Sequence, residues 1–138
     1  MAKDLIHAAV REAIEKANWE VTDDPLHLPV DSTVLAIDLG AERLIGATLA
    51  DKRIAIEIKT LSRKSLLYDF YAAFGQYIIY RDALREQEID RTIYMAISEV
   101  KYQLLEQKPF LMRRIIQHDI KLIVVNTFAK QIVKWINH

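Results

Sequence analysis

The chain has 138 residues and no cysteine, which predicts one globular domain over residues 1–138 and excludes disulfides and zinc–thiolate sites. Lys plus Arg and Asp plus Glu both number 19, so the net charge is zero and any contact with nucleic acid needs a local basic patch. No stretch approaches the roughly 18 apolar residues of a membrane-spanning helix, and the first ten residues do not form a signal peptide. We therefore expect a cytoplasmic protein that does not enter a membrane.

The first predicted element is a helix over residues 4–18, where apolar residues recur at helical spacing. Glu12 lies seven positions after Leu5, almost two full turns, so it falls near the edge of the apolar face. Residues 19–30 contain two prolines and predict a short strand followed by a loop.

Three strands are predicted next, over residues 33–39, 43–50 and 53–60, with a turn at Asp51-Lys52 between the last two. The third strand alternates clearly, so its isoleucines should point to one side of a sheet. Its other side would then carry Ala55, Glu57 and Lys59.

A helix should follow from Ser62 or Ser65, either of which can cap it, to about Arg85. This helix is rich in aromatic residues. Gly75 lies inside it at a cost in helix propensity, which indicates a close packing contact at that position.

The remaining elements alternate between strand and helix: strand 92–97, helix 109–118, strand 121–125, and a final helix capped by Asn126 or Thr127. Consecutive early strands predict antiparallel pairing, and the later alternation predicts parallel crossovers. The expected fold class is therefore α/β, in its α+β variant, with a central mixed sheet flanked by helices. The apolar side of the final helix should comprise Phe128, Ile132, Val133 and Ile136.

The strongest candidates for chemistry are acidic, because the sequence has no phosphate-binding loop, no nucleophile elbow and no histidine spacing typical of a metal site. Glu57 and Lys59 share one face of a strand, and Asp38 ends a strand that can pair beside it. Two neighbouring carboxylates suit Mg²⁺ or Mn²⁺, which activates water and offsets charge on a phosphate. The alternative is an ordinary half-exposed strand with one charged face.

Further candidates surround this group. Gln76 and Tyr80 are four residues apart on one helix face and could reach the same cleft, although Tyr80 could equally belong to the aromatic core and Gln76 to the exposed surface. Arg63 and Lys64 belong to a local run of basic residues that could contact DNA, or that could simply be a solvated surface.

Together these residues resemble the PD-(D/E)XK nuclease superfamily, with Asp38 as the motif Asp and Glu57 and Lys59 in the D/E-x-K positions. Glu12 matches the acidic residue that some branches carry on the first helix. Gln76 and Tyr80 match the Q-x-x-x-Y motif of RecB-like branches, whereas Ile37 replaces the motif proline. The resemblance implies a restriction-endonuclease-like core and a metal-dependent endodeoxyribonuclease.

The sequence is more closely similar to the XisH-type fdxN element excision controlling factors, a family found mainly in cyanobacteria. The similarity is carried by four segments: MAKDLIHAAV, AIDLGAERLIGA, IAIEIKT and FGQYIIYRDAL. It implies an accessory role in programmed excision of a DNA element, beside a site-specific recombinase and an XisI-type companion protein.

Three hypotheses follow. The first is a Mg²⁺- or Mn²⁺-dependent DNA phosphodiesterase, in which Asp38 and Glu57 hold the metal and Lys59 assists the water. In this hypothesis, secondary roles fall to Glu12, Gln76 and Tyr80. The protein can act as a homodimer. The second is a non-catalytic regulatory module that acts through an XisI-type protein or the recombinase. The third is a structural ion-pair network.

Overall fold

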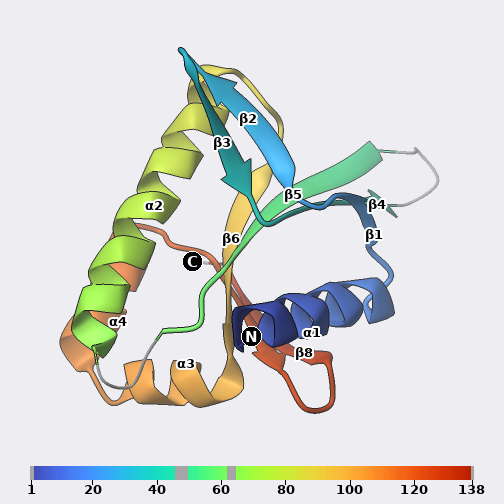
Figure 1. Ribbon diagram of the computed structural model, residues 1–138. Coiled ribbons are helices and arrows are strands. Elements are labelled where there is room, and N and C mark those ends of the chain that lie inside the picture. The colour runs from blue at the N-terminus through green and yellow to red at the C-terminus, as the bar shows by residue number, and fades with distance from the viewer. Residues whose placement is uncertain (1, 46–49, 62–64, 138) are drawn as a thin grey trace.

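In the computed structural model, which describes residues 2–45, 50–61 and 65–137, six strands form a central mixed sheet in the order β1-β4-β5-β6-β7-β8 (Figure 1). The helices are α1 (Ala2–Lys16), α2 (Leu66–Glu86), α3 (Glu99–Glu106) and α4 (Pro109–Gln117). The strands are β1 (Glu20–Asp23), β2 (Leu26–Val30), β3 (Thr33–Ile37), β4 (Leu39–Ile45), β5 (Ala50–Ile58), β6 (Thr92–Ser98), β7 (Leu122–Asn126) and β8 (Gln131–Ile136).

The pairing directions agree with the predicted mixed sheet. Strands β1, β4 and β5 are antiparallel neighbours, whereas β5, β6 and β7 run parallel and are joined by helical crossovers. Strand β8 closes the sheet antiparallel to β7, and β2 with β3 forms a separate hairpin. The hairpin projects beside α2 at the top of Figure 1.

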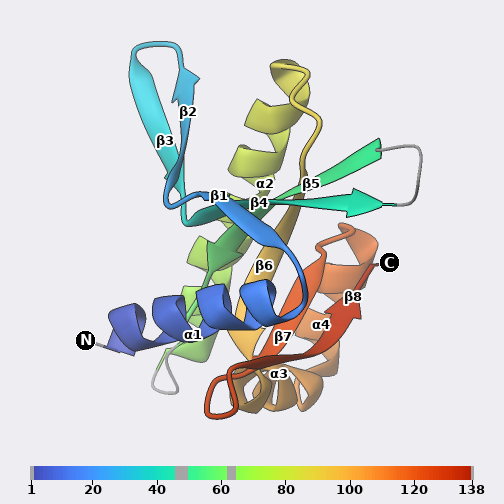
Figure 2. The same cartoon turned by 90° about the vertical axis from the view of Figure 1, so that its right-hand side faces the viewer.

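The two faces of the sheet have separate cores, and the alternation in β5 divides them as predicted. Ile54, Ile56 and Ile58 pack with the apolar face of α1, while Ala55 packs with α2, α3 and α4 on the other side. Figure 2 shows α1 crossing the near side of the sheet. Glu57 therefore faces the side covered by α2.

The predicted C-terminal helix is wrong, because residues 131–136 form β8. Asn126 Oδ1 accepts the N–H groups of Phe128 and Ala129 and so closes a tight turn instead of capping a helix. A register irregularity in the β7–β8 pair lets Ile132 and Trp135, three residues apart, both pack on the α1 side. A spacing of three residues also places two side chains on one face of a helix, so the sequence pattern of this strand resembles that of a helix.

Several predicted boundaries are also wrong. Asp51 and Lys52 lie within β5, paired with Leu44 and Arg43, so they make no turn. The loop expected before residue 30 is largely β2, and the strand expected at 33–39 is divided between β3 and β4 at Asp38. Helix α3 was not predicted. Ser65 precedes α2 without a side-chain capping bond, and Ser62 lies outside the described residues.

Two glycines lead to opposite predictions for substitution by alanine. Gly75 is exposed on α2, and a Cβ built there meets nothing within 4 Å, so the predicted close packing at Gly75 is wrong. In contrast, a Cβ on Gly40 would lie 2.9 Å from Asp23 Oδ2 and 3.0 Å from Arg91 Nη1. Gly75→Ala should stabilise the protein by about 0.5–1 kcal/mol, and Gly40→Ala should destabilise it by about 1–3 kcal/mol. Urea unfolding of both variants tests this, and equal effects would contradict it.

None of the helices in the described part of the chain combines the length and the apolar character that crossing a membrane requires.

Candidate functional site

The centre of the candidate site lies where β4 begins beside β5. Leu39 pairs with Ile56, so Asp38, directly before β4, is adjacent to Glu57. Each carboxylate accepts a hydrogen bond from the backbone of the opposite segment: Ile58 N donates to Asp38 Oδ2 at 2.8 Å, and Asp38 N donates to Glu57 Oε1 at 3.3 Å. The backbone of each strand thus fixes the carboxylate of the other.

A chain of polar contacts continues from Glu57 to α2. Lys59 Nζ lies 3.0 Å from Glu57 Oε2 and donates to Gln76 Oε1. The amide of Gln76 in turn donates to the Tyr80 hydroxyl at 2.7 Å, which donates to the carbonyl of Ala36 at 3.4 Å. The structure therefore brings together all five residues of the two predicted motifs: Asp38, Glu57, Lys59, Gln76 and Tyr80.

Glu57 is a buried carboxylate residue, with 5% of its surface exposed. Burial and the nearby Asp38 carboxylate raise the pKa of Glu57 to about 7, against the opposing effect of Lys59. Burial, Glu57 and Asp38 also raise the pKa of Tyr80, while its hydrogen bond with Gln76 opposes that rise. Lys59 therefore only partly offsets the cost of ionising Glu57, and a cation bound beside this carboxylate would stabilise its ionised form.

The donor set fits a hard divalent cation. Each carboxylate oxygen has two lone pairs, so Asp38 and Glu57 keep acceptor capacity beyond the hydrogen bonds described above. Among the described residues, no group of three or more His, Cys, Asp or Glu side chains could hold a metal. The two carboxylates of Asp38 and Glu57 suit Mg²⁺ better than Ca²⁺. Mg²⁺ usually binds one or two carboxylates and completes its shell with waters and substrate phosphates.

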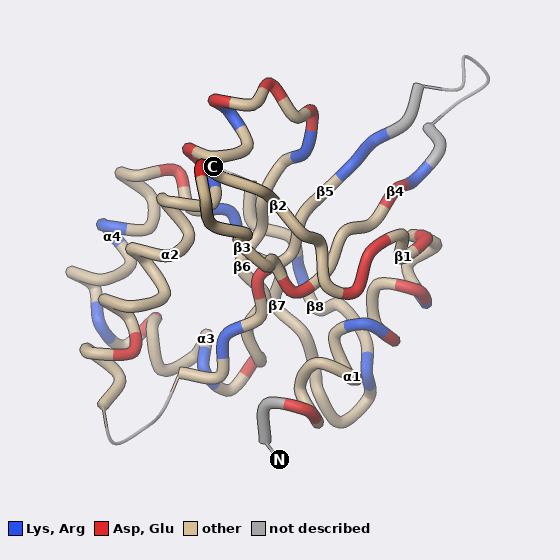
Figure 3. Tube along the Cα trace, turned by 45° about the horizontal axis from the view of Figure 1, so that its top comes forward, with Lys and Arg blue, Asp and Glu red and all other residues tan. Residues whose placement is uncertain are grey.

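The other predicted site residues lie elsewhere or are not described. Glu12 is on α1, across the sheet from the face that carries Glu57, and pairs with Lys16 at 3.4 Å. Arg63 and Lys64 lie outside the described residues. Arg53, from the same basic run, pairs with Glu42 at 3.2 Å. In Figure 3, acidic and basic positions are interspersed over the fold.

Sequence reasoning missed the backbone partners of the site. The amide groups of Asp38 and Ile58 and the carbonyl of Ala36 orient its side chains. Only the register of β4 on β5 and the approach of α2 to β3 place them there, and no residue type signals this in advance.

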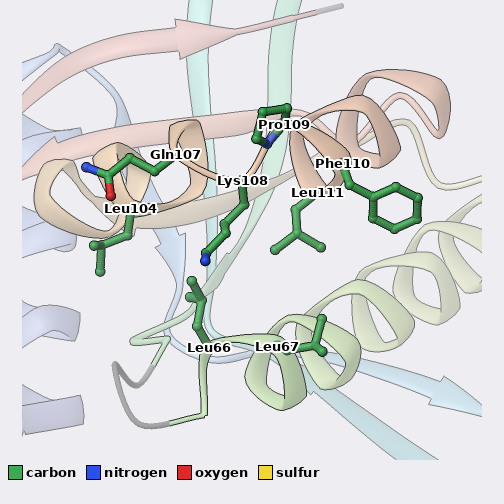
Figure 4. A pocket seen from close by; sticks show the side chains of 8 residues that line it. All are labelled: Leu66, Leu67, Leu104, Gln107, Lys108, Pro109, Phe110 and Leu111. Atoms are coloured by element: carbon green, nitrogen blue, oxygen red, sulfur yellow. The ribbon is translucent and has the colours of Figure 1, made fainter.

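A hollow of about 870 Å³ lies apart from these residues, between the start of α2 and the junction of α3 and α4 (Figure 4). Its lining is mainly apolar, with Lys108 as its charged residue. Phe110 is 59% exposed at this hollow.

Comparison with known proteins identifies the relatives of the chain. The sequence model of the XisH protein family matches residues 1–133. The crystal structure of an fdxN element excision controlling factor protein from Anabaena variabilis is 35% identical, with a TM-score of 0.87 over 97% of this chain and 99% of that chain. An XisH family protein from Nostoc punctiforme PCC 73102 is 33% identical, with a TM-score of 0.85 over 96% and 99% of the two chains.

Among curated proteins, no sequence matches the chain significantly. The family match covers nearly the whole chain, and both solved structures share its mixed sheet over almost their full lengths. The chain therefore belongs to the XisH family.

Proposed function

We propose that this protein is an accessory factor in programmed DNA excision that acts as a Mg²⁺-dependent DNA phosphodiesterase with a PD-(D/E)XK-type centre. The observation that carries the proposal is that backbone hydrogen bonds hold the carboxylates of Asp38 and Glu57 side by side, with Lys59 Nζ at 3.0 Å from Glu57. The XisH family supplies the link to DNA excision. We also propose that the fold is of the restriction-endonuclease-like type.

Each residue has a definite task in this proposal. Asp38 and Glu57 would hold Mg²⁺ or Mn²⁺, which when bound lowers the pKa of a water and offsets charge on the phosphate. The ammonium of Lys59 would orient the attacking water and stabilise the charge on the phosphate. Gln76 fixes Lys59 through its amide oxygen, and Tyr80 fixes Gln76.

The direct test is DNA cleavage by the purified protein. Supercoiled plasmid, branched DNA and single-stranded DNA are incubated with Mg²⁺ or Mn²⁺ and, separately, with EDTA. We expect cleavage only with the metal. Glu57→Ala purified in the same way controls for contaminating nuclease, because it removes a proposed metal ligand. Intact DNA in all metal conditions, also with an XisI-type companion protein present, would contradict the proposal.

A second candidate is a non-catalytic module that acts through a protein partner, such as an XisI-type protein or a recombinase. Two observations favour it. Lys59 is already paired with Glu57 and Gln76, and large apolar side chains are exposed on α2 and α4, among them Leu67, Tyr68 and Phe110. Such surfaces often mark protein interfaces. The cleavage experiment separates the two candidates, because a regulator leaves all the DNA forms intact.

A further inference from the structure

A groove of about 550 Å³ lies at the carboxyl ends of the three parallel strands. It is lined by Thr60 just beyond β5, Ser98 at the end of β6 and Thr127 just beyond β7. Residues of α1 form its apolar wall. Ligands of open α/β sheets bind outside the carboxyl ends of parallel strands, so the groove is at the edge where a ligand is expected.

The groove has the polar groups that recognise a phosphate backbone. Lys101 and Lys130 line it, and none of its ten lining residues, all within the described part of the chain, is acidic. Its three hydroxyl groups, from Thr60, Ser98 and Thr127, are of a kind that commonly contacts phosphate and sugar oxygens. In a chain of zero net charge, this local excess of positive charge favours a polyanion.

An exposed aromatic side chain also lines this groove. Phe128 is 96% exposed at the turn between β7 and β8, which lies below α1 in Figure 2. The turn is held by the two hydrogen bonds to Asn126 Oδ1 and by Lys16 Nζ, which donates to the carbonyl of Ala129 at 3.2 Å. An exposed ring on a hydrogen-bonded turn contributes little to folding, but it offers a flat surface on which an unpaired base can stack.

The groove adjoins the candidate site through the end of β5. Thr60 follows Lys59 directly, and Ile58 packs on the α1 side of the sheet while Glu57 faces the α2 side. A DNA strand that crosses the end of β5 can therefore contact the groove on one side of the sheet and the Asp38–Glu57–Lys59 group on the other.

We propose that this groove binds single-stranded DNA, with a base stacked on Phe128 and phosphates at Lys101 and Lys130, and that it leads the strand to the Asp38–Glu57–Lys59 group. The inference deepens the proposed function, on which its second part rests, by naming single-stranded or unpaired DNA as the substrate class. Duplex DNA keeps its base faces stacked internally, so it cannot use Phe128 in this way.

The test is binding without catalysis. Fluorescence anisotropy in EDTA follows a labelled single strand of about 20 nucleotides, a length that exceeds the site sizes of small single-strand-binding domains. A duplex of the same sequence is measured beside it. We expect the single strand to bind more tightly than the duplex and Phe128→Ala to weaken single-strand binding about tenfold. The double variant Lys101→Glu/Lys130→Glu should weaken it at least as much and reduce its salt dependence.

Matched variants at the other hollow serve as controls. Phe110→Ala and Lys108→Glu remove an exposed ring and a lysine from the surface in Figure 4, so they should leave binding unchanged. Wild-type affinity in Phe128→Ala, or an equal loss in Phe110→Ala, would overturn the inference. A second copy of the chain covering the groove would also overturn it, and sedimentation showing a dimer that Phe128→Ala dissociates would reveal this.

The two proposals can fail separately. Single-strand binding that depends on Phe128, without cleavage of any DNA in Mg²⁺, would support the groove and contradict the nuclease. Cleavage that disappears in Glu57→Ala, together with binding that is insensitive to Phe128, would support the nuclease and overturn the groove.

Discussion

Lys59→Ala should lower the rate of metal-dependent DNA cleavage by about 10²–10⁴-fold, the range typical of removing one group that stabilises the transition state or transfers a proton. The variant loses the ammonium that lies 3.0 Å from Glu57 and donates to Gln76. Because that ammonium holds down the pKa of Glu57, its loss should also move the acidic limb of the pH–rate profile to higher pH. Single-turnover rates measured across pH give both effects together.

Lys108→Ala is the matched control, because it removes an exposed lysine from the hollow of Figure 4 without touching the site. Circular dichroism and urea unfolding of both variants show whether the fold is intact. A Lys59→Ala protein that is folded and cleaves DNA at the wild-type rate would exclude a role for this ammonium in the reaction.

The mixed sheet flanked by helices could be predicted because hydrophobic periodicity reports burial. In β5, alternate isoleucines assign one face to α1 and leave Glu57 on the other, as the sequence predicted. The failure at β8 has a local cause. The irregular β7–β8 register puts Ile132 and Trp135 on one side, and the same three-residue spacing fits a helix.

The five residues of the candidate site could be selected from sequence spacing, but their mutual contacts could not. Asp38 reaches Glu57 only because β4 pairs with β5 in the register that sets Leu39 against Ile56. Gln76 reaches Lys59 because α2 packs over that face of the sheet. The groove could not be predicted at all, since Thr60, Ser98 and Thr127 are distant in sequence and meet only through parallel pairing.

Glu57→Gln should make the metal-free protein more stable than the wild type at alkaline pH. The carboxyl group has an ordinary pKa of 4.5 and a raised value of about 7 in the folded protein, because burial and Asp38 disfavour its charged form. The folded state therefore binds more protons than the unfolded state between these two values, so wild-type stability falls as the pH rises through this window. At about 1.4 kcal/mol per pKa unit, the full effect is on the order of 3 kcal/mol.

Glutamine does not titrate and resembles the protonated acid in shape, so any local cost of the substitution is nearly constant with pH. The measurement is urea unfolding of both proteins in EDTA at about pH 4 and about pH 8, where the difference in unfolding free energy should grow in favour of the variant. Glu12→Gln, which removes a carboxylate on α1 away from the site, is the matched control. Added Mg²⁺ should stabilise the wild type above pH 7 and have little effect on Glu57→Gln, because a ligand stabilises only the protein that binds it. A difference that stays constant from pH 4 to pH 8 would mean that Glu57 has the same pKa in the folded and unfolded protein, and this would contradict the cost of ionising it beside Asp38.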